Sequence, residues 1–294
     1  MFFSGISDEA GASIETQIKA HKELRWKHLE LRKVDGQGIL SLGDREFGAV
    51  FRALKDANMK VSCLGSPIGD WSHSIRDSFL ADANLMRRAV KRARQLAELG
   101  MLPFVRVMSY PNDKNDPMPK ELWQERAITR MRGLLKIVED SDVILAHENC
   151  SGWGGITIEN NVALFETIDS QANRPAIRAL RVLFDTGNPP TYGYNSWEWY
   201  QLVKPWIAYV HIKDAKKVDG EDVYTYPGEG DGCVRQILAD LLERGYDGFV
   251  SIEPHLEAVI HTGQEASSKQ AAYDSYVEYG RRLMRIIEEI KATA

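Results

Sequence analysis

The sequence predicts an α/β protein with a single (β/α)8 TIM-barrel domain spanning residues 1–294. Eight short apolar runs alternate with segments of helical periodicity, and no Ser/Gly-rich linker or composition shift divides the chain. An open dinucleotide-binding sheet is disfavoured, because no Gly-x-Gly-x-x-Gly turn follows the first run. With 294 residues, 44% of them hydrophobic, the chain is long enough to bury one continuous core.

The predicted strands are short runs rich in Val, Ile, Leu and Phe. The segments between them are long enough for a loop and a helix, so we expect parallel strands joined by crossover helices. In chain order the predicted strands are residues 2–6, 28–32, 60–64, 104–109, 143–148, 180–185, 208–213 and 249–253.

The predicted helices follow from capping residues and apolar stripes. Ser13 is expected to cap a helix that ends at residue 25, and Asp44 to cap one whose apolar residues share a face. A third stripe runs from Leu85 to Ala97 and is ended by Gly100. The remaining helices are expected at residues 122–138, 158–168, 196–203, 234–242 and 276–290.

Four potential metal ligands each lie at the end of their own strand-like run. They are Glu148 in VILAHEN, Asp185 in LRVLFDTGN, His211 in IAYVHIKD and Glu253 in GFVSIEPH. The carboxyl ends of barrel strands meet at one mouth, so we expect these side chains to converge. Taken singly, a carboxylate here can instead cap the next helix, and His211 can be an ordinary core histidine. Together they predict one divalent-metal site, for Mn²⁺ first and Mg²⁺, Co²⁺ or Zn²⁺ as alternatives.

Glu148 and Glu253 are also the predicted catalytic residues. If they flank a bound hydroxyketone, one glutamate removes a proton beside the carbonyl, the metal stabilises the enediolate, and the other glutamate returns the proton. The predicted activity is isomerisation or epimerisation of a small carbohydrate, namely a sugar, keto-sugar or sugar phosphate.

At these residues the sequence resembles the xylose isomerase-like superfamily of sugar isomerases and epimerases, which includes ketose 3-epimerases, inosose dehydratases and relatives of apurinic endonucleases. The HIKD segment at 211–214 and the PGEGD segment at 227–231 add to the resemblance. It implies that Glu148, Asp185, His211 and Glu253 bind one divalent metal, that both glutamates act as acid and base, and that the protein forms a dimer or tetramer. Several epimerases of the family have a histidine shortly after the Asp ligand, where this chain has Asn188.

Six further residues are predicted to bind substrate, each with an alternative role. Asn188 is expected to bond a sugar hydroxyl, and Trp153 in the SGWGG segment to stack on a sugar face. Lys213 follows His211 by two residues, so it faces the same side; it either polarises a substrate oxygen or pairs with a ligand or with Asp214. The set is completed by Arg106, His255 and Glu229, and a buried barrel ion pair is the alternative for Arg106, as it is for Glu30 and Arg32.

Composition limits the partners. A formal net charge of −5 does not favour nucleic acid or an anionic membrane. The first residues lack the pattern of a signal peptide and no run reaches 18 apolar residues, so we expect a cytoplasmic protein. Three widely spaced cysteines predict neither a disulfide framework nor a zinc knuckle.

Two other classes of function remain open. A lyase on the same site, acting by β-elimination as an inosose-type dehydratase or a keto-sugar deglycosidase does, shares the first proton abstraction and needs an acid near the leaving group. A nuclease or a non-catalytic sugar-binding barrel is disfavoured. A three-metal centre needs more histidines on the early strands than this chain offers, and a non-catalytic barrel is expected to have lost a ligand, whereas all four are present.

Overall fold

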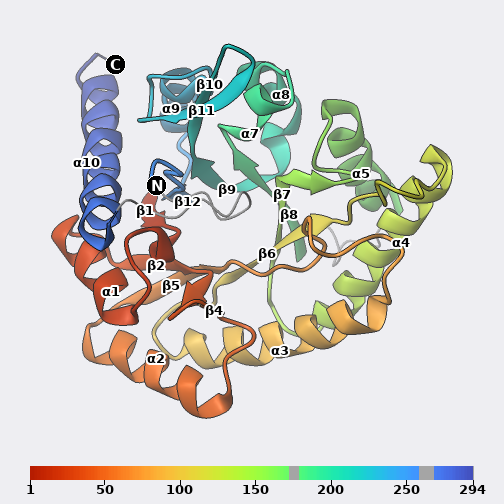
Figure 1. The fold of residues 1–294 in the computed structure, drawn as a ribbon, viewed down its shortest axis with the longest axis horizontal. Helices are drawn as coiled ribbons and strands as arrows, with labels where there is room; N and C mark the ends of the chain where they lie inside the picture. Colours follow the sequence, from red (N-terminus) through yellow and green to blue (C-terminus); the bar gives the residue numbers. More distant parts are fainter. Residues whose placement is uncertain (172–178, 258–267, 294) are drawn as a thin grey trace.

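The computed structural model describes residues 1–171, 179–257 and 268–293, and its centre is a parallel barrel (Figure 1). The eight-stranded sheet has the order β1-β12-β9-β8-β7-β6-β5-β2, and an isolated parallel bridge between Ile6 and Glu30 brings its two edges together. The predicted (β/α)8 fold is therefore confirmed. The strands are β1 (Phe2–Gly5), β2 (His28–Leu31), β5 (Lys60–Leu64), β6 (Phe104–Ser109), β7 (Leu145–Gly152), β8 (Leu180–Asp185), β9 (Ile207–Ile212) and β12 (Phe249–Ile252).

Helices lie around the outside of the barrel (Figure 1). They are α1 (Ile14–Glu23), α2 (Asp44–Asp56), α3 (Phe79–Ala97), α4 (Lys120–Val138), α5 (Ile158–Gln171), α7 (Asn188–Thr191), α8 (Ser196–Val203), α9 (Val234–Glu243) and α10 (Lys269–Thr293). Ser13 caps α1 as expected, by accepting a hydrogen bond from the Thr16 amide. The cap of α2 is Gly43 rather than Asp44, because the Glu46 carboxylate reaches back to the Gly43 amide at 2.6 Å.

The barrel interior changes from apolar to polar along its axis. At one end, Cys63, Ala146, Leu183, Tyr209 and Phe249 form a small buried cluster that is separate from the core between strands and helices. The two residues that follow along β9 and β12 on the inward side are polar, because side chains alternate along a strand. Polar side chains therefore occupy the barrel interior at the carboxyl ends of these strands, where the sequence predicted the site.

Two short hairpins were not predicted. β3 (Lys33–Val34) pairs with β4 (Gln37–Gly38), and β10 (Asp214–Val218) pairs with β11 (Glu221–Thr225). Asp-Gly pairs form both turns, at 35–36 and 219–220, and all four residues have positive φ, as a type I′ turn requires. An Asp-Gly pair is the sequence signal of a hairpin turn, so both hairpins could have been predicted from the sequence.

The PGEGD segment folds around the first residue of the second hairpin. The Asp214 carboxylate accepts backbone hydrogen bonds from Gly228, Gly230 and Gly232 at 2.8, 3.0 and 2.9 Å. A Cβ atom at Gly230 would lie 2.5 Å from the Asp214 carboxylate, so the close approach requires glycine. This contact anchors the base of the β10–β11 hairpin beside the barrel mouth.

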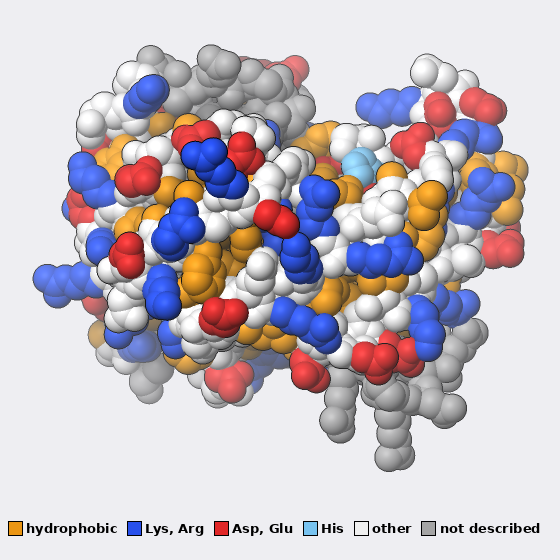
Figure 2. Space-filling model, turned by 90° about the horizontal axis from the view of Figure 1, so that it is seen from below, with side chains coloured by type: hydrophobic (Ala, Val, Ile, Leu, Met, Phe, Trp, Pro, Cys, Tyr) orange, Lys and Arg blue, Asp and Glu red, His pale blue; other side chains and the backbone are white. Residues whose placement is uncertain are grey.

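The face in Figure 2 mixes basic and acidic side chains, with hydrophobic side chains between them, so it carries no extended field of one sign. Among the helices of the described residues, none combines the length and apolarity needed to span a membrane.

Candidate metal centre

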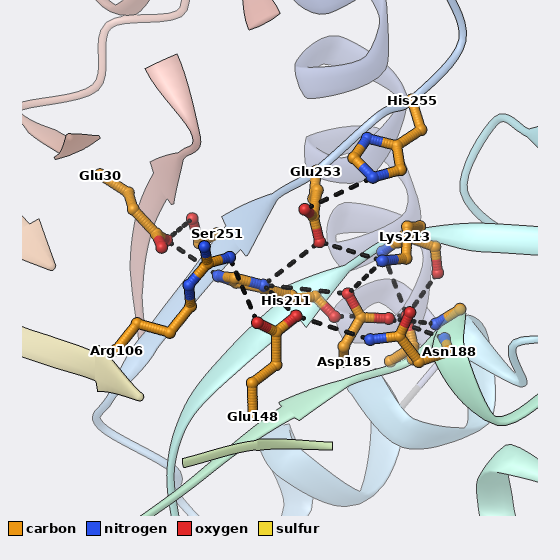
Figure 3. Close-up of polar contacts among 12 residues, drawn as sticks. Glu30, Arg106, Glu148, Asp185, Asn188, His211, Lys213, Ser251, Glu253 and His255 are labelled. Carbon is orange, nitrogen blue, oxygen red and sulfur yellow. Dashed lines mark hydrogen bonds and ion pairs between the residues drawn. The ribbon is translucent and has the colours of Figure 1, made fainter. Parts of the chain in front are cut away.

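The four predicted ligands converge at the carboxyl ends of neighbouring strands (Figure 3). Glu148 lies in β7, Asp185 ends β8, His211 lies in β9, and Glu253 directly follows β12. Asp185 is in register with His211 in the parallel ladder. One ligand atom from each residue lies within 4.8 Å of the others, and all four side chains are buried. The tertiary structure thus brings together residues that are spread over more than a hundred positions of sequence.

The Nδ1 atom of His211 points into this group. It lies 3.4 Å from a Glu253 oxygen, 3.5 Å from a Glu148 oxygen and 3.8 Å from an Asp185 oxygen. This nitrogen is buried and has no hydrogen-bond partner, although such atoms are normally satisfied. A divalent cation among three carboxylates and one imidazole nitrogen would satisfy it, so the residues fit a metal.

Glu30 holds the other nitrogen of His211. Its Oε2 atom is 2.9 Å from His211 Nε2, and the same oxygen accepts hydrogen bonds from Tyr209 at 3.0 Å and Ser251 at 2.9 Å. A carboxylate at Nε2 keeps the proton on that nitrogen and leaves the Nδ1 lone pair free for a metal. The sequence indicates only an ion pair or a sugar contact for Glu30, because its bond to His211 joins two distant strands and leaves no local pattern.

Two cationic side chains balance the carboxylates. Arg106 donates to Glu148 at 3.2 Å, and the Lys213 ammonium lies 3.0 Å from Asp185 and 3.1 Å from Glu253. Lys213 therefore pairs with two of the predicted ligands, which is one of the alternatives considered for it. Both cations also line the cavity above the site, so they remain in reach of a substrate.

The ionisation of the site without metal follows from these contacts. Burial raises the pKa of Asp185 to about 7, although Lys213 opposes the shift. Burial also acts against the charged form of Glu253, but Lys213 and the neighbouring histidines outweigh it and hold the pKa of Glu253 well below its ordinary value. Burial disfavours a charged His211, yet Glu30, Glu148 and Glu253 raise the pKa of His211 well above its ordinary range. A proton and a metal therefore compete for His211 Nδ1.

Backbone contacts keep Asp185 in place. Its Oδ1 accepts from the amides of Gly187 and Asn188, each at 2.8 Å, so Oδ2 is left to face the site. The Asn149 side chain bonds both the amide and the carbonyl of Asp185, at 2.6 and 3.1 Å, and so ties the end of β8 to β7. A Cβ atom at Gly187 would lie 2.7 Å from Lys213, which explains the glycine there.

The barrel fold described above agrees with a comparison of the sequence with models of protein families. A protein-family model described as a xylose isomerase-like TIM barrel matches residues 23–279. The chain belongs to this family. No sequence among the curated proteins matches the chain.

Several solved structures resemble this xylose isomerase-like barrel over nearly its whole length. The probable 3-DHS dehydratase AsbF from Bacillus anthracis has a TM-score of 0.73 at 16% identity and covers 97% of this chain and 99% of its own. A D-tagatose 3-epimerase-like protein has a TM-score of 0.70 at 20% identity, with 98% and 99% covered. The IOLI protein, solved with a zinc atom, has a TM-score of 0.69 at 13% identity, with 99% of both chains covered. At these identities the likeness establishes the fold.

A cavity of about 960 Å³ opens above the ligands of this xylose isomerase-like barrel. Its inner wall includes Glu148, Glu253 and four of the predicted substrate-binding residues, Arg106, Asn188, Lys213 and His255. Asn188 lies 3.5 Å from a Glu148 oxygen, so it reaches the site. Asp185 and His211 are fully buried beneath this wall.

Two residues predicted to bind substrate do not lie on the cavity wall. Trp153 is 1% exposed and packs in the hydrophobic core instead of lining the cavity, because the turn after β7 directs it inward. Glu229 lies on the exposed PGEGD segment and pairs with Arg282 of α10 at 2.6 Å, away from the cavity. Neither position was distinguishable from a mouth residue by its place in the sequence.

The aromatic residues of the segment from 189 to 199 lie in two different environments. Tyr192 lines the cavity and donates a hydrogen bond to the Cys150 carbonyl. Trp199 is fully buried, and Trp197 stacks on Tyr200 with ring centroids 5.6 Å apart. Tyr192 thus reaches the mouth, while Trp197 and Trp199 pack α8 into the fold.

A second acidic and histidine-containing cluster lies beside the first and shares Glu253. Glu9, in a short helix at Ser7–Glu9 after β1, accepts from His255 Nδ1 at 3.0 Å and from the His255 amide at 2.9 Å. Arg32 donates to Glu9 and to Asp8, each at 3.2 Å, and lies 3.5 Å from the other oxygen of Glu253. Glu9 was not among the predicted site residues, because it follows the first strand within a polar stretch with no distinguishing motif.

Proposed function

We propose that this protein is a divalent-metal-dependent isomerase or epimerase of a sugar, keto-sugar or sugar phosphate. The observation that carries the proposal is the placement of two carboxylates, Glu148 and Glu253, at opposite sides of one ligand group and on the wall of one cavity. The comparisons support this class through the D-tagatose 3-epimerase-like protein, whereas the probable 3-DHS dehydratase supports a lyase.

The residues have distinct tasks in this proposal. Glu148 and Glu253 exchange protons with carbons beside the substrate carbonyl, one taking a proton and the other returning it. Arg106 and Lys213 keep the two carboxylates charged and oriented through the contacts described above. Asn188 is placed to bond a substrate hydroxyl next to Glu148. A bound divalent metal supplies Lewis-acid stabilisation of the negative charge that develops on the substrate oxygens.

The proposed metal is Mn²⁺, with Mg²⁺, Co²⁺ and Zn²⁺ as alternatives. Three carboxylates and one histidine are mostly hard oxygen donors, which suit Mn²⁺ and Mg²⁺, while the imidazole also admits Co²⁺ or Zn²⁺. Zinc in the related IOLI protein agrees with such a site in this fold.

A lyase is the second candidate, and His255 favours it. Its Nε2 lies 3.6 Å from Glu253, and the residue lines the cavity. Glu9 binds the opposite nitrogen, so His255 is held where it can donate a proton to a departing β-hydroxyl or β-linked group. Elimination would begin with the same proton abstraction as isomerisation.

Exchange in D₂O separates the two reactions. Metal-loaded protein is incubated with D-fructose, D-tagatose, 3-keto-D-glucose and a keto-inositol, and the products are followed by NMR and mass spectrometry. Deuterium beside the carbonyl without loss of water supports isomerisation or epimerisation, and loss of water supports the lyase. Glu148→Gln and Glu253→Gln, tested at equal metal loading, are expected to reduce exchange by roughly 10²–10⁴-fold. Exchange that is unchanged in both variants would refute the proposed roles.

A further inference from the structure

The cavity is larger than a single sugar requires. Pockets of about 300–1,000 Å³ enclose drug-sized ligands, and the cavity of about 960 Å³ lies at the top of that range. The ligand group and its cations occupy only the inner wall. Much of the volume therefore lies between this wall and the loops that follow the strands.

The outer part of the cavity differs in chemistry from the inner part. Four aromatic residues line it, from four different connections of the barrel: Trp71 after β5, Trp123 in α4, Tyr192 after α7 and Tyr224 in β11. Trp71 and Tyr192 are 45% and 40% exposed, whereas Glu148 and Glu253 are 1% and 4% exposed. The cavity thus passes from a charged, buried floor to an aromatic, accessible rim.

Three of these rings are held in place by contacts within the protein. Trp123 donates from its indole nitrogen to the Tyr110 carbonyl at 2.8 Å, and Tyr192 donates to the Cys150 carbonyl. Tyr224 packs edge-on against His255 with centroids 5.2 Å apart. Rings that are already ordered lose little conformational entropy when a ligand stacks on them, so the rim is organised for a planar or ring-shaped group.

Polar side chains lie between the aromatic ones. Asn112, Asp113 and Lys114 come from the loop after β6, and Asp222 comes from the β10–β11 hairpin opposite. Aromatic faces next to amide, carboxylate and ammonium groups match a ring that has an apolar face and polar edges. Asn112 and Asp113 bond the backbone of their own loop, and Asp222 pairs with Lys217 at 2.7 Å, so these groups are held at the edge of the cavity before a ligand binds.

We propose that the substrate is a glycoside: the reacting sugar lies at the metal and carries a second ring, which stacks on Trp71 and Tyr192 at the rim. The inference rests on the proposed function, because it takes the reacting ring to lie at the ligand group. The second ring is either another sugar or an aromatic aglycone, and the same rim chemistry accepts both.

Binding measurements with a matched series test this subsite. The probes are the methyl, p-nitrophenyl and glucosyl β-glycosides of 3-keto-D-glucose, which share the reacting ring and differ only in the group attached to it. Calorimetry on the metal-loaded protein is expected to give affinities about fivefold to tenfold higher for at least one of the two-ring probes than for the methyl glycoside. The tighter of the two identifies the second ring as a sugar or an aryl group.

Variants of the rim separate stacking from general effects. Trp71→Ala and Tyr192→Ala are expected to bring the two-ring probes to within about twofold of the methyl glycoside, while Trp71→Phe keeps a ring and the preference. Phe2→Ala is the control, since Phe2 is 51% exposed at the start of β1 and does not line the cavity. Metal content and thermal unfolding are measured for every variant, to confirm that each is folded and loaded.

The failures are distinguishable. If the methyl and two-ring glycosides bind equally and the rim variants change nothing, the subsite is refuted, while deuterium exchange in the methyl glycoside keeps the proposed function. If no glycoside probe binds but a substrate of the D₂O panel exchanges, the subsite is refuted and the proposed function stands. If neither the probes nor that panel exchange with stoichiometric metal present, the proposed function is refuted and the subsite with it.

Discussion

Two clusters of acidic and histidine side chains lie side by side at the mouth of this barrel and share Glu253. In the first, His211 Nδ1 is buried, lacks a hydrogen-bond partner and faces three carboxylates. In the second, Glu9 is bonded by His255 and by Arg32, whose guanidinium lies between Glu9 and Glu253. A similar set of residue types therefore gives two different local environments.

The difference shows that residue composition does not by itself identify a metal site. Both groups place three or more possible ligand atoms within 4.8 Å. An arginine that already bonds the carboxylates opposes a cation in the second cluster, because two positive charges would share one set of oxygens. In the first cluster Arg106 contacts a Glu148 oxygen other than the one that faces His211, and Lys213 contacts the Asp185 and Glu253 oxygens that do face it. What distinguishes this cluster is the buried Nδ1 of His211, which has no hydrogen-bond partner and which a metal would satisfy. The first cluster is accordingly the metal site that we propose.

The largest expected effect comes from removing a ligand that belongs to the first cluster alone. His211→Asn is expected to lose near-stoichiometric metal, with an affinity loss greater than the 10–100-fold typical of outer-shell changes. Glu9→Gln, in the second cluster alone, is expected to keep its metal. Metal analysis after purification with excess Mn²⁺, with thermal unfolding of each apoprotein, checks both. Equal metal loss in the two variants would contradict the distinction between the clusters.

Removing Arg32 tests whether the second cluster serves stability. Arg32→Met leaves Asp8 and Glu9 buried beside Glu253 without their shared cation, so we expect the free energy of unfolding to fall by about 3–5 kcal/mol while metal binding persists. Denaturant unfolding measures the change. The control is Arg76→Met, which breaks an exposed ion pair to Asp116 and should cost at most about 1 kcal/mol. If the free energy of unfolding falls by a similar small amount in both variants, the second cluster does not stabilise the fold.

Replacing Glu30 tests how the first cluster is oriented. Glu30→Gln is expected to weaken Mn²⁺ binding by roughly 10–100-fold, because a neutral amide no longer fixes the proton on His211 Nε2. Competition with a chelator gives the affinity. Tyr209→Phe removes another hydrogen bond to the same Glu30 oxygen without touching His211, and it is expected to have a smaller effect. If the two variants bind Mn²⁺ with equal affinity, the hydrogen bond between Glu30 and His211 does not determine metal affinity.

The smallest effect at neutral pH concerns a buried histidine outside both clusters. Burial lowers the pKa of His21, which bonds the Gln17 carbonyl and the Tyr276 hydroxyl, to about 4, compared with about 6.5 in an unfolded chain. The unfolded state therefore binds a proton that the folded state does not. This contribution to stability is complete above pH 6.5 and is lost as the pH falls towards 4, by up to about 1.4 kcal/mol per pH unit. His21→Gln should reduce this pH dependence in denaturant titrations; a variant with the wild-type slope would contradict it.

The sequence alone determined the barrel and the four proposed ligands. Eight apolar runs separated by helical stripes allow few other folds, and parallel strands of a barrel direct their carboxyl ends to one mouth. Glu148, Asp185, His211 and Glu253 are therefore brought together by topology, without knowledge of any individual contact. The same logic predicted Arg106, Asn188, Lys213 and His255 at the cavity, because each lies on or just beyond a strand end.

Only the tertiary structure decided which of these side chains contact one another. Glu30 and His211 are 181 positions apart, and Glu9 and His255 are 246 apart, so neither contact leaves a local signal in the sequence. Trp153 and Glu229 were misplaced for the same reason: the turn that buries Trp153 and the helix that supplies Arg282 are set by packing between distant segments. The strands can be read from local patterns of hydrophobicity. The partner of a buried charge depends instead on which distant side chain the folded chain places within hydrogen-bonding distance.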